Sequence, residues 1–505
     1  MAPASKAGAV NELAPEPYAA VADLPTGNRR TGRPARLRDL PTYYYHAHFL
    51  EMLAFVDAHY DHVLDARQRT FRTDFESLSF PAQCLYVRLL NRRGRLFARP
   101  RLRYPEIANI DAALLELTHA GFAAQPDPAC VDELLNLLTR AQLLAVLRAH
   151  LQGLRSNLKK VELVELARDR FAPDTLFDLL PREGIVMQGR SEETSFLLFL
   201  FFGRVQESLS SFTMRDLGLV RVHEGADGYE ARFSERDDAR HAYFFAKRLD
   251  RLHRDPRCSA DLYQEIDTWP APQASNAADF RDQLALDLGR ALEADSAAAL
   301  RVYQLGESVQ CSERVMRLLV SSGRRDEART YLERCIAAPS CDEEALLAAD
   351  IYARKFAKKR TSKLTDQLRA AEVVEVDEAH RGAPERAVVR WFHSRGQRAF
   401  RVENSLWRTF FGLLFWDLLF DADTAGLHSP FERLPSSLLE RRFLVDNAAA
   451  IQDRLALLDD VATARRHLVR VCGEARYSER SLSVATGDPR CAACPDRSGA
   501  CKRPS

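Results

Sequence analysis

Apolar residues recur at the three- and four-residue spacing of amphipathic helices along most of the chain, and this periodicity restricts the fold more than any other feature. The first such stretch places Tyr44, Phe49, Met52 and Val56 on one face of a helix that begins near residue 43. Helices of this kind are stable only when their apolar faces pack against other elements. We therefore expect a mainly α fold.

The length of the chain indicates that these helices form several modules. A single hydrophobic core stops growing at about 250–300 residues, whereas this chain has 505 residues. Hydrophobic residues make up 46% of the sequence and charged residues 28%, which excludes a wholly disordered or fibrous protein.

The sequence shows no sign of a membrane segment. No window approaches the roughly 18–20 consecutive apolar residues of a membrane span, and the N-terminus lacks the apolar run of a signal peptide. The apolar run at residues 196–202 is too short to span a bilayer and predicts a buried core helix. The ten cysteines are mostly scattered, which in a reducing compartment is typical of buried thiols. We expect a cytoplasmic protein with no membrane partner; the sequence predicts no oligomeric state.

A basic segment between two predicted helices is the first candidate for function. The first helix carries Leu85 and Leu89, and the second covers residues 107–120 and ends at Gly121, a typical C-terminal stop. Seven arginines lie in and between these helices: Arg88, Arg92, Arg93, Arg95, Arg99, Arg101 and Arg103. This order of a helix, a basic segment and a second helix favours a winged-helix or helix-turn-helix unit that contacts DNA phosphates. The alternative is a solvated surface, because runs of charged residues often serve solubility. The formal net charge of +1 does not distinguish DNA contact from a solvated surface.

A predicted helical hairpin at residues 133–169 carries a basic turn. Gly153 marks the turn, and the second helix begins after Asn157 with Lys159 and Lys160. Helix N-termini and lysine side chains can bind a phosphate backbone. A plain helix pair without a ligand is the alternative.

From residue 281 to residue 360 the pattern indicates loosely repeated helical pairs, with a turn at residues 321–325. Small and apolar residues, including Gly323, Ala328 and Leu332, occupy tetratricopeptide-like positions, so we expect a short helical solenoid. The stretch ends in a basic cluster that either binds a phosphate or is a solvated helix end. Its members include Arg354, Lys355, Lys358 and Lys359.

Only part of a DNA-cleaving motif is present. Metal-dependent cleavage needs several carboxylates that converge on one or two Mg²⁺ or Mn²⁺ ions, and restriction-endonuclease-like nucleases supply a helical Glu, then Pro-Asp and Glu-x-Lys on two strands. Glu403 opens a strongly apolar helix at residues 403–420, although a carboxylate there also suits the positive N-terminal dipole of a helix. The strand elements are missing, because Pro495-Asp496 is the only C-terminal Pro-Asp and none of the nine residues after it is Glu.

Several stretches of the sequence resemble the Fanconi-anaemia-associated nuclease family, whose members carry a C-terminal virus-type replication-repair nuclease domain. They lie at residues 43–55, 77–93, 198–219 and 402–420 and in the repeat region, so that the resemblance covers residues 41–460. The block Glu-Asn-x-Leu-(x)4-Phe-Gly-Leu-Leu-Phe-Trp-Asp, from Glu403 to Asp417, is the most specific of them.

The resemblance implies a fold and an activity. The fold would have a winged-helix and SAP-like DNA-binding half, a tetratricopeptide-like half and a restriction-endonuclease-like α/β nuclease domain, which here would be truncated. The activity would be a phosphodiesterase I-type reaction on DNA with 5′ flaps, branches or interstrand crosslinks, with Mn²⁺ or Mg²⁺ as cofactor and Glu403 as the first metal ligand. Because the family's other ligands have no counterpart, we expect a nucleoid-associated bacterial protein that binds such DNA without cleaving it. The alternative is a branched-DNA-binding protein without any catalytic role.

The sequence changes character after Asp460, where it becomes rich in Arg, Ser and Cys. A shifted reading frame or premature stop would explain an intact body with an unfamiliar tail. The alternative is a zinc site in the tail, although a single Cys-x2-Cys is a weak zinc motif. Its ligands would be Cys472, Cys491, Cys494 and Cys501.

These observations divide the chain into seven predicted segments. They are a disordered arm (1–40), a winged-helix-like domain (41–130), a SAP-like hairpin (131–172), a linking domain (173–280), tetratricopeptide-like repeats (281–370), the helical start of a nuclease domain (371–460) and a disordered tail (461–505).

Overall fold

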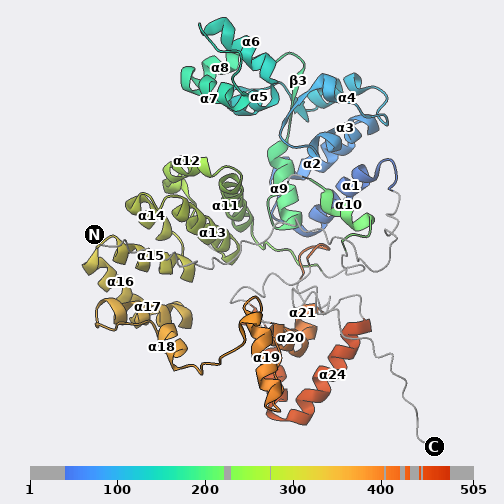
Figure 1. The fold of residues 1–505 in the computed structure, drawn as a ribbon. Helices are drawn as coiled ribbons and strands as arrows, with labels where there is room; N and C mark the ends of the chain where they lie inside the picture. The colour runs from blue at the N-terminus through green and yellow to red at the C-terminus, as the bar shows by residue number, and fades with distance from the viewer. Residues whose placement is uncertain are drawn as a thin grey trace, which may run out of the picture.

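The computed structural model describes residues 40–206, 208–220, 229–272, 274–402, 405–420, 427–432, 443–444 and 447–477. Within these residues the fold is mainly helical, which confirms the predicted fold class (Figure 1). The described part of the chain contains no helix that is long and apolar enough to cross a membrane. The predicted arm at residues 1–40 lies, except for its last residue, outside the described residues.

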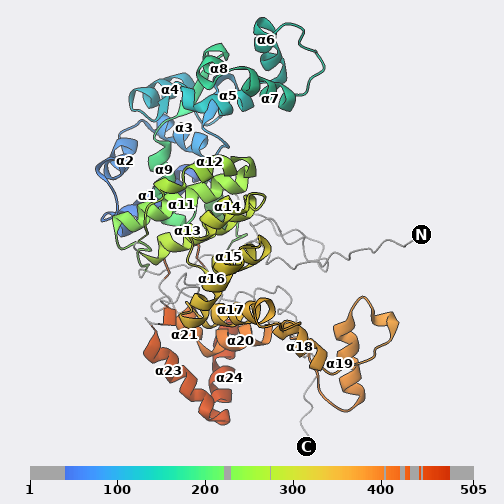
Figure 2. The ribbon, with the colours of Figure 1, turned by 90° about the vertical axis from the view of Figure 1, so that its left-hand side faces the viewer.

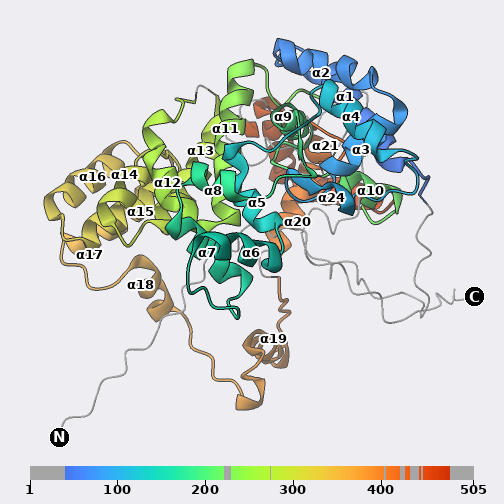
Figure 3. The same cartoon turned by 90° about the horizontal axis from the view of Figure 1, so that it is seen from above.

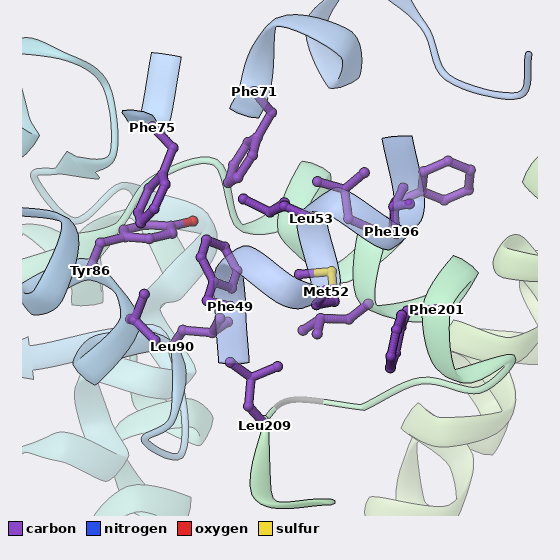
Figure 4. Packing of buried hydrophobic residues seen from close by; sticks show 14 of the residues in the cluster. Phe49, Met52, Leu53, Phe71, Phe75, Tyr86, Leu90, Phe196, Phe201 and Leu209 are labelled. Atoms are coloured by element: carbon purple, nitrogen blue, oxygen red, sulfur yellow. The ribbon is translucent and has the colours of Figure 1, made fainter. Parts of the chain in front are cut away.

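The N-terminal body is built around an aromatic core. Its helices are α1 (Tyr44–Tyr60), α2 (Ala66–Glu76), α3 (Phe80–Leu90), α4 (Ile110–His119), α9 (Ser191–Phe202) and α10 (Ser210–Asp216). Phe49, Phe71, Phe75 and Tyr86 are fully buried and point toward one another from α1, α2 and α3 (Figure 4). The apolar run predicted as a core helix is α9, whose residues 196–202 are all buried. One aromatic cluster therefore holds distant parts of the sequence together.

A small antiparallel sheet completes this body. It consists of β1 (Leu96–Ala98), β3 (Ile185–Gln188) and β2 (Ala123–Ala124) in the order β1-β3-β2. Gly189, next to β3, lies so close to the backbone carbonyl of Gly121 that a Cβ atom would be 2.2 Å from its oxygen. The sequence pattern did not predict β3, although this strand joins the other two.

Four helices form an excursion between β2 and β3. They are α5 (Val131–Leu137), α6 (Arg140–His150), α7 (Lys160–Arg170) and α8 (Pro173–Leu179), and they stand at one end of the molecule (Figure 1). Leu134, Leu143, Leu147 and Leu163 are buried in a core of their own. Because β3 follows the excursion, the chain leaves the body after β2 and returns to the same sheet.

A second set of helices continues from α9. It comprises α11 (Arg236–Arg254), α12 (Ser259–Gln264), α13 (Ser275–Ala291), α14 (Ser296–Tyr303), α15 (Val309–Ser321), α16 (Arg325–Ala337) and α17 (Asp342–Lys355). From α13 to α17 each helix packs on the next one, and α15 also packs on α13 and α17. The predicted turn between α15 and α16 is present, with Gly323 at a φ of 74°. The stacking suits a short helical array, and its tetratricopeptide character stays a prediction.

The C-terminal helices lie below this array (Figures 1 and 2). They are α18 (Lys363–Ala370), α19 (Pro384–Ser394), α20 (Ser405–Leu414), α21 (Trp416–Phe420), α23 (Ala448–Ala456) and α24 (Val461–Tyr477). The short 3-10 helices among the described residues are η1 (Arg99–Arg101), η2 (Pro128–Cys130), η3 (Pro256–Cys258), η4 (Ile266–Thr268), η5 (Glu378–His380) and η7 (Leu457–Asp459).

The prediction of a disordered segment from residue 461 onward is wrong for its first part, which forms α24. The Asp460 side chain accepts hydrogen bonds from the backbone N–H of Thr463 at 2.9 Å and from its hydroxyl at 2.6 Å, and so caps the helix. Val471 is fully buried in a cluster with residues of α20 and α21, and His467 contacts the carbonyl oxygen of Leu414. The cap and the packing of Val471 therefore stabilise this helix. Residues 478–505 lie outside the described residues.

One C-terminal segment, residues 427–432, packs on the N-terminal body, and we name it the docking segment. Phe431 lies with its ring centroid 4.8 Å from that of Phe212 on α10. Glu432 forms an ion pair with Arg232, and both side chains are nearly buried. The segment therefore connects the helices that follow residue 402 to the aromatic core.

Five of the cysteines that the structure describes are buried, as expected for thiols that act as small hydrophobes. They are Cys84, Cys130, Cys258, Cys311 and Cys335.

Candidate DNA interface

Three of the seven arginines predicted to contact DNA are engaged within the protein. Arg88 pairs with Glu106 and lies 3.8 Å over the ring of Tyr45. Arg95 donates two hydrogen bonds, at 3.1 and 2.6 Å, to one carboxylate oxygen of Glu133 on α5. These contacts make Arg88 and Arg95 parts of the fold rather than free phosphate ligands.

Arg99 is the third internally paired arginine. Its Nε donates to Asp111 at the start of α4 at 2.5 Å. This hydrogen bond lowers the pKa of the Asp111 carboxyl and raises that of the guanidinium, so both groups stay charged at neutral pH. The pair links η1 to the first turn of α4.

The other four arginines form an exposed group that we name the α3–η1 arginines. Its members are Arg92, Arg93, Arg101 and Arg103. None of them contacts a carboxylate among the described residues, and only Arg92 has a side-chain partner, the hydroxyl of Tyr104 at 3.1 Å. Exposed guanidinium groups without a carboxylate partner retain their donors for phosphate oxygens.

The turn that presents Arg92 and Arg93 is held in place on both sides. Asn91 ends α3; its side-chain nitrogen donates to the carbonyl of Val87 at 3.0 Å, and its side-chain oxygen accepts from the backbone of Leu209 at 2.8 Å. Gly94 then adopts a φ of 79°, which favours glycine over residues with a Cβ atom. The chain then enters β1, so Arg92 and Arg93 stand on a fixed turn, whereas Arg101 and Arg103 follow β1 at the end of η1 and just after it.

The predicted lysine pair lies at the start of α7, in the excursion. Lys159 is exposed, and its side chain contacts no carboxylate in the part of the chain that the structure describes. The ammonium of Lys160 donates to the carbonyl of Asn136 at 2.5 Å and ties α7 to the end of α5. Lys159 is therefore the better candidate for a phosphate contact.

The predicted cluster at the end of α17 is partly neutralised. Arg354 pairs with Asp350 at 3.0 Å, and Lys359 pairs with Asp366 at 3.0 Å. Lys355 and Lys358 are exposed, and neither contacts a carboxylate within the described ranges.

The three basic clusters do not form one site. The helices α3 and α4 lie in one part of the molecule, α7 in a second and α17 in a third, as Figures 1 and 2 both show.

The residues that decide which of the arginines are paired could not be identified from the sequence. Tyr104 and Glu106 lie 12 and 18 residues from the arginines they contact. Only the carboxylate inside an otherwise basic stretch could have suggested that Arg88 is paired.

The predicted nuclease residues are incompletely described. Glu403 lies outside the described residues, and Asp417, the last residue of the family-like block, accepts a hydrogen bond from Arg454 at 2.6 Å. Among the residues that the structure describes, no three His, Cys, Asp or Glu side chains are grouped closely enough to hold a metal ion.

The alternative zinc site is also largely untested by the structure. Cys472 lies on α24 and is partly buried. The other three predicted ligands, Cys491, Cys494 and Cys501, lie outside the described residues.

Comparisons with known proteins identify relatives of both the N-terminal body and the longer chain. A family model described as "FAN1, HTH domain" matches residues 43–124, which include α1 to α4, β1 and β2. The curated Fanconi-associated nuclease 1 homolog of Pseudomonas aeruginosa is 28% identical over 443 residues, and the match covers 83% of this chain and 76% of that protein. The homolog of Arabidopsis thaliana is 24% identical over 477 residues, which cover 81% of this chain and 53% of the plant protein.

Two solved structures are similar to this chain. The crystal structure of paFAN1 bound to 2-nucleotide 5′ flap DNA with a gap has a TM-score of 0.68 and 25% identity, and the match covers 88% of this chain and 82% of that one. The corresponding structure with 1-nucleotide 5′ flap DNA has a TM-score of 0.66 and 25% identity, with coverage of 86% and 82%.

Proposed function

The chain belongs to the Fanconi-associated nuclease 1 family, and from this premise we propose that it binds branched DNA with a 5′ flap through the α3–η1 arginines. The similar solved structures contain 5′ flap DNA, and a DNA partner is consistent with the helix-turn-helix domain that the family model matches. A site of action on the bacterial nucleoid, in the repair of branched or crosslinked DNA, follows from this proposal.

The division of the seven arginines carries the proposal. Arg88, Arg95 and Arg99 have carboxylate partners, whereas the α3–η1 arginines have none among the described residues. The exposed set therefore retains its donors for phosphate oxygens.

Salt-dependent binding tests this proposal. The triple variant Arg93→Ala/Arg101→Ala/Arg103→Ala should bind a gapped 5′ flap DNA about tenfold or more weakly in fluorescence anisotropy. The slope of log K against log salt should become shallower by roughly three, since each lost duplex phosphate contact removes about 0.9.

The chain provides a matched control for the lost charge. The variant Arg317→Ala/Arg324→Ala/Arg329→Ala also removes three positive charges, but from ion pairs with Glu313, Glu327 and Glu333 on and beside α15 and α16. It should leave the slope nearly unchanged. Equal slopes for the two triple variants would contradict the proposed interface.

We further propose that the chain binds flap DNA without cleaving it. The support is the sequence after Glu403, which contains no Glu-x-Lys and only one Pro-Asp, the motifs that would supply the further metal ligands. A labelled 5′ flap substrate should remain intact in Mn²⁺ or Mg²⁺ under conditions where it is bound. Cleavage that Glu403→Ala abolishes would refute this part of the proposal.

A further inference from the structure

A second basic surface lies on α19 and the residues that follow it. Six arginines occur between residues 381 and 401, where Glu385 is the only carboxylate. They are Arg381, Arg386, Arg390, Arg395, Arg398 and Arg401. We name this stretch the α19 arm.

Two of these arginines lie near carboxylates. Arg381 approaches Glu378 at 3.9 Å, and Arg401 approaches Glu385 at 3.9 Å, both at the limit for an ion pair. The carboxylates that precede the arm at residues 372–377 form no ion pair with it in the described part of the chain.

The central arginines of the arm are exposed. Arg386, Arg390 and Arg398 contact no carboxylate within the described ranges, and Arg390 contacts only the ring nitrogen of His380, at 3.3 Å. Such groups keep their charge and their donors available to solvent or to an anionic ligand.

Aromatic rings accompany the arginines. The guanidinium of Arg395 lies 3.6 Å over the ring of Trp391, and Phe400 exposes 72% of its surface. Exposed rings next to guanidinium groups are the combination that binds single-stranded nucleic acid, because bases stack on the rings while the cations follow the backbone. A surface that served only solubility would have no use for an exposed phenylalanine.

The arm also stands apart from the rest of the molecule. α19 has its main contact with the adjacent η5, and Figures 2 and 3 show it extending from the body between two connecting segments. A ligand could therefore reach the arm without displacing other elements.

We infer that the α19 arm binds single-stranded DNA, with Arg386, Arg390 and Arg398 on the phosphates and Phe400 against a base. This inference rests on the proposed function, since it assigns the flap strand of the branched DNA to the arm. The duplex part of the same DNA belongs to the α3–η1 arginines.

The test uses the full chain and a single-stranded oligothymidylate in fluorescence anisotropy. Arg386→Ala/Arg390→Ala/Arg398→Ala should weaken binding several-fold and make the salt slope shallower by roughly two, because each single-strand phosphate contact contributes about 0.7. Phe400→Ala should weaken binding further, whereas Phe400→Trp should retain it. Far-UV circular dichroism checks that the exposed substitutions preserve the fold.

The control triple variant of α15 and α16 removes the same charge and should keep the wild-type slope. An arm variant that matches the wild type or this control would overturn the inference. Binding of gapped duplex DNA without a flap separates the two proposals. The arm variant should bind this DNA as tightly as the wild type does. The Arg93→Ala/Arg101→Ala/Arg103→Ala variant should bind it more weakly. Loss of duplex binding in the arm variant would also overturn the assignment to a single strand.

Discussion

The N-terminal body and the C-terminal helices differ in what covers their apolar faces. In the body Phe49, Phe71 and Tyr86 are fully buried. In α18 and α20, by contrast, Leu368 exposes 66% of its surface and Trp407 exposes 73%. Both regions have helical periodicity, so the pattern that forms a helix does not ensure that another element covers its apolar face. We expect the body to determine global stability and the C-terminal helices to open more easily.

The largest effect should come from the aromatic core. Phe71→Ala should lower the free energy of unfolding of the N-terminal body by about 3–5 kcal/mol, because it leaves a cavity among buried rings. Trp407→Ala, at an exposed site, should change it by less than about 0.5 kcal/mol. Urea denaturation followed by circular dichroism measures both; similar losses would remove the distinction between the two regions.

The docking segment connects the two regions, and breaking it should have the next largest effect. Glu432→Ala removes the ion pair with the nearly buried Arg232, which should cost about 1–3 kcal/mol locally. Hydrogen exchange of residues 427–432 should accelerate, while that of α1 should not change. Glu313→Ala, which breaks an exposed pair with Arg317, is the control and should have little effect.

Within the body, substitution of Arg88 should affect stability, whereas substitution of Arg101 should affect DNA binding. Arg88→Ala removes the pairing with Glu106 and the contact with Tyr45, and should lower the melting temperature by several degrees. Arg101→Ala should leave the melting temperature unchanged and weaken flap binding. A stability loss for Arg101→Ala would show that its side chain has a structural role instead.

The smallest effect concerns the cap of α24. Hydrogen bonds from the Thr463 hydroxyl and backbone hold the pKa of Asp460 below its usual range. Because the pKa of Asp460 is lower in the folded state than in the unfolded state, the cap stabilises α24 fully above the unfolded-state pKa of about 3.9. This stabilisation is lost as the pH falls through the folded-state pKa. Protection factors of α24 should therefore decline only in acid.

The variant Asp460→Asn isolates this titration. Its amide oxygen can still accept the hydrogen bonds but does not titrate. Its α24 protection, corrected for intrinsic exchange, should vary less between pH 5 and pH 3 than that of the wild type. The same decline in both proteins would assign the effect to another group.

Much of the fold followed from local patterns in the sequence. Helical periodicity predicted α3, α4 and the buried α9, and the segment around Gly323 predicted the turn between α15 and α16. The strand β3 was not predicted, because a four-residue strand is recognisable only through its pairing with β1 and β2, which lie far away in sequence. The helix α24 was missed for a related reason, since Val471 is buried only by contact with α20 and α21.

The candidate interface was predicted as a segment but not residue by residue. Composition marked residues 88–103 as basic, but the pairings with Glu106, Glu133 and Asp111 span 18, 38 and 12 residues and depend on the tertiary fold. The α19 arm was not singled out at all, because its arginines are spread over a helix and its flanks instead of forming a run. In both places the distinction between a paired and an exposed arginine required three-dimensional contacts.

The most direct test of this account follows one labelled, gapped 5′ flap DNA through binding and reaction in the same sample. With Mn²⁺ present, we predict a bound complex whose affinity falls steeply with salt, and a substrate that stays intact. Salt-independent binding, or cleavage that is lost in Glu403→Ala, would contradict it.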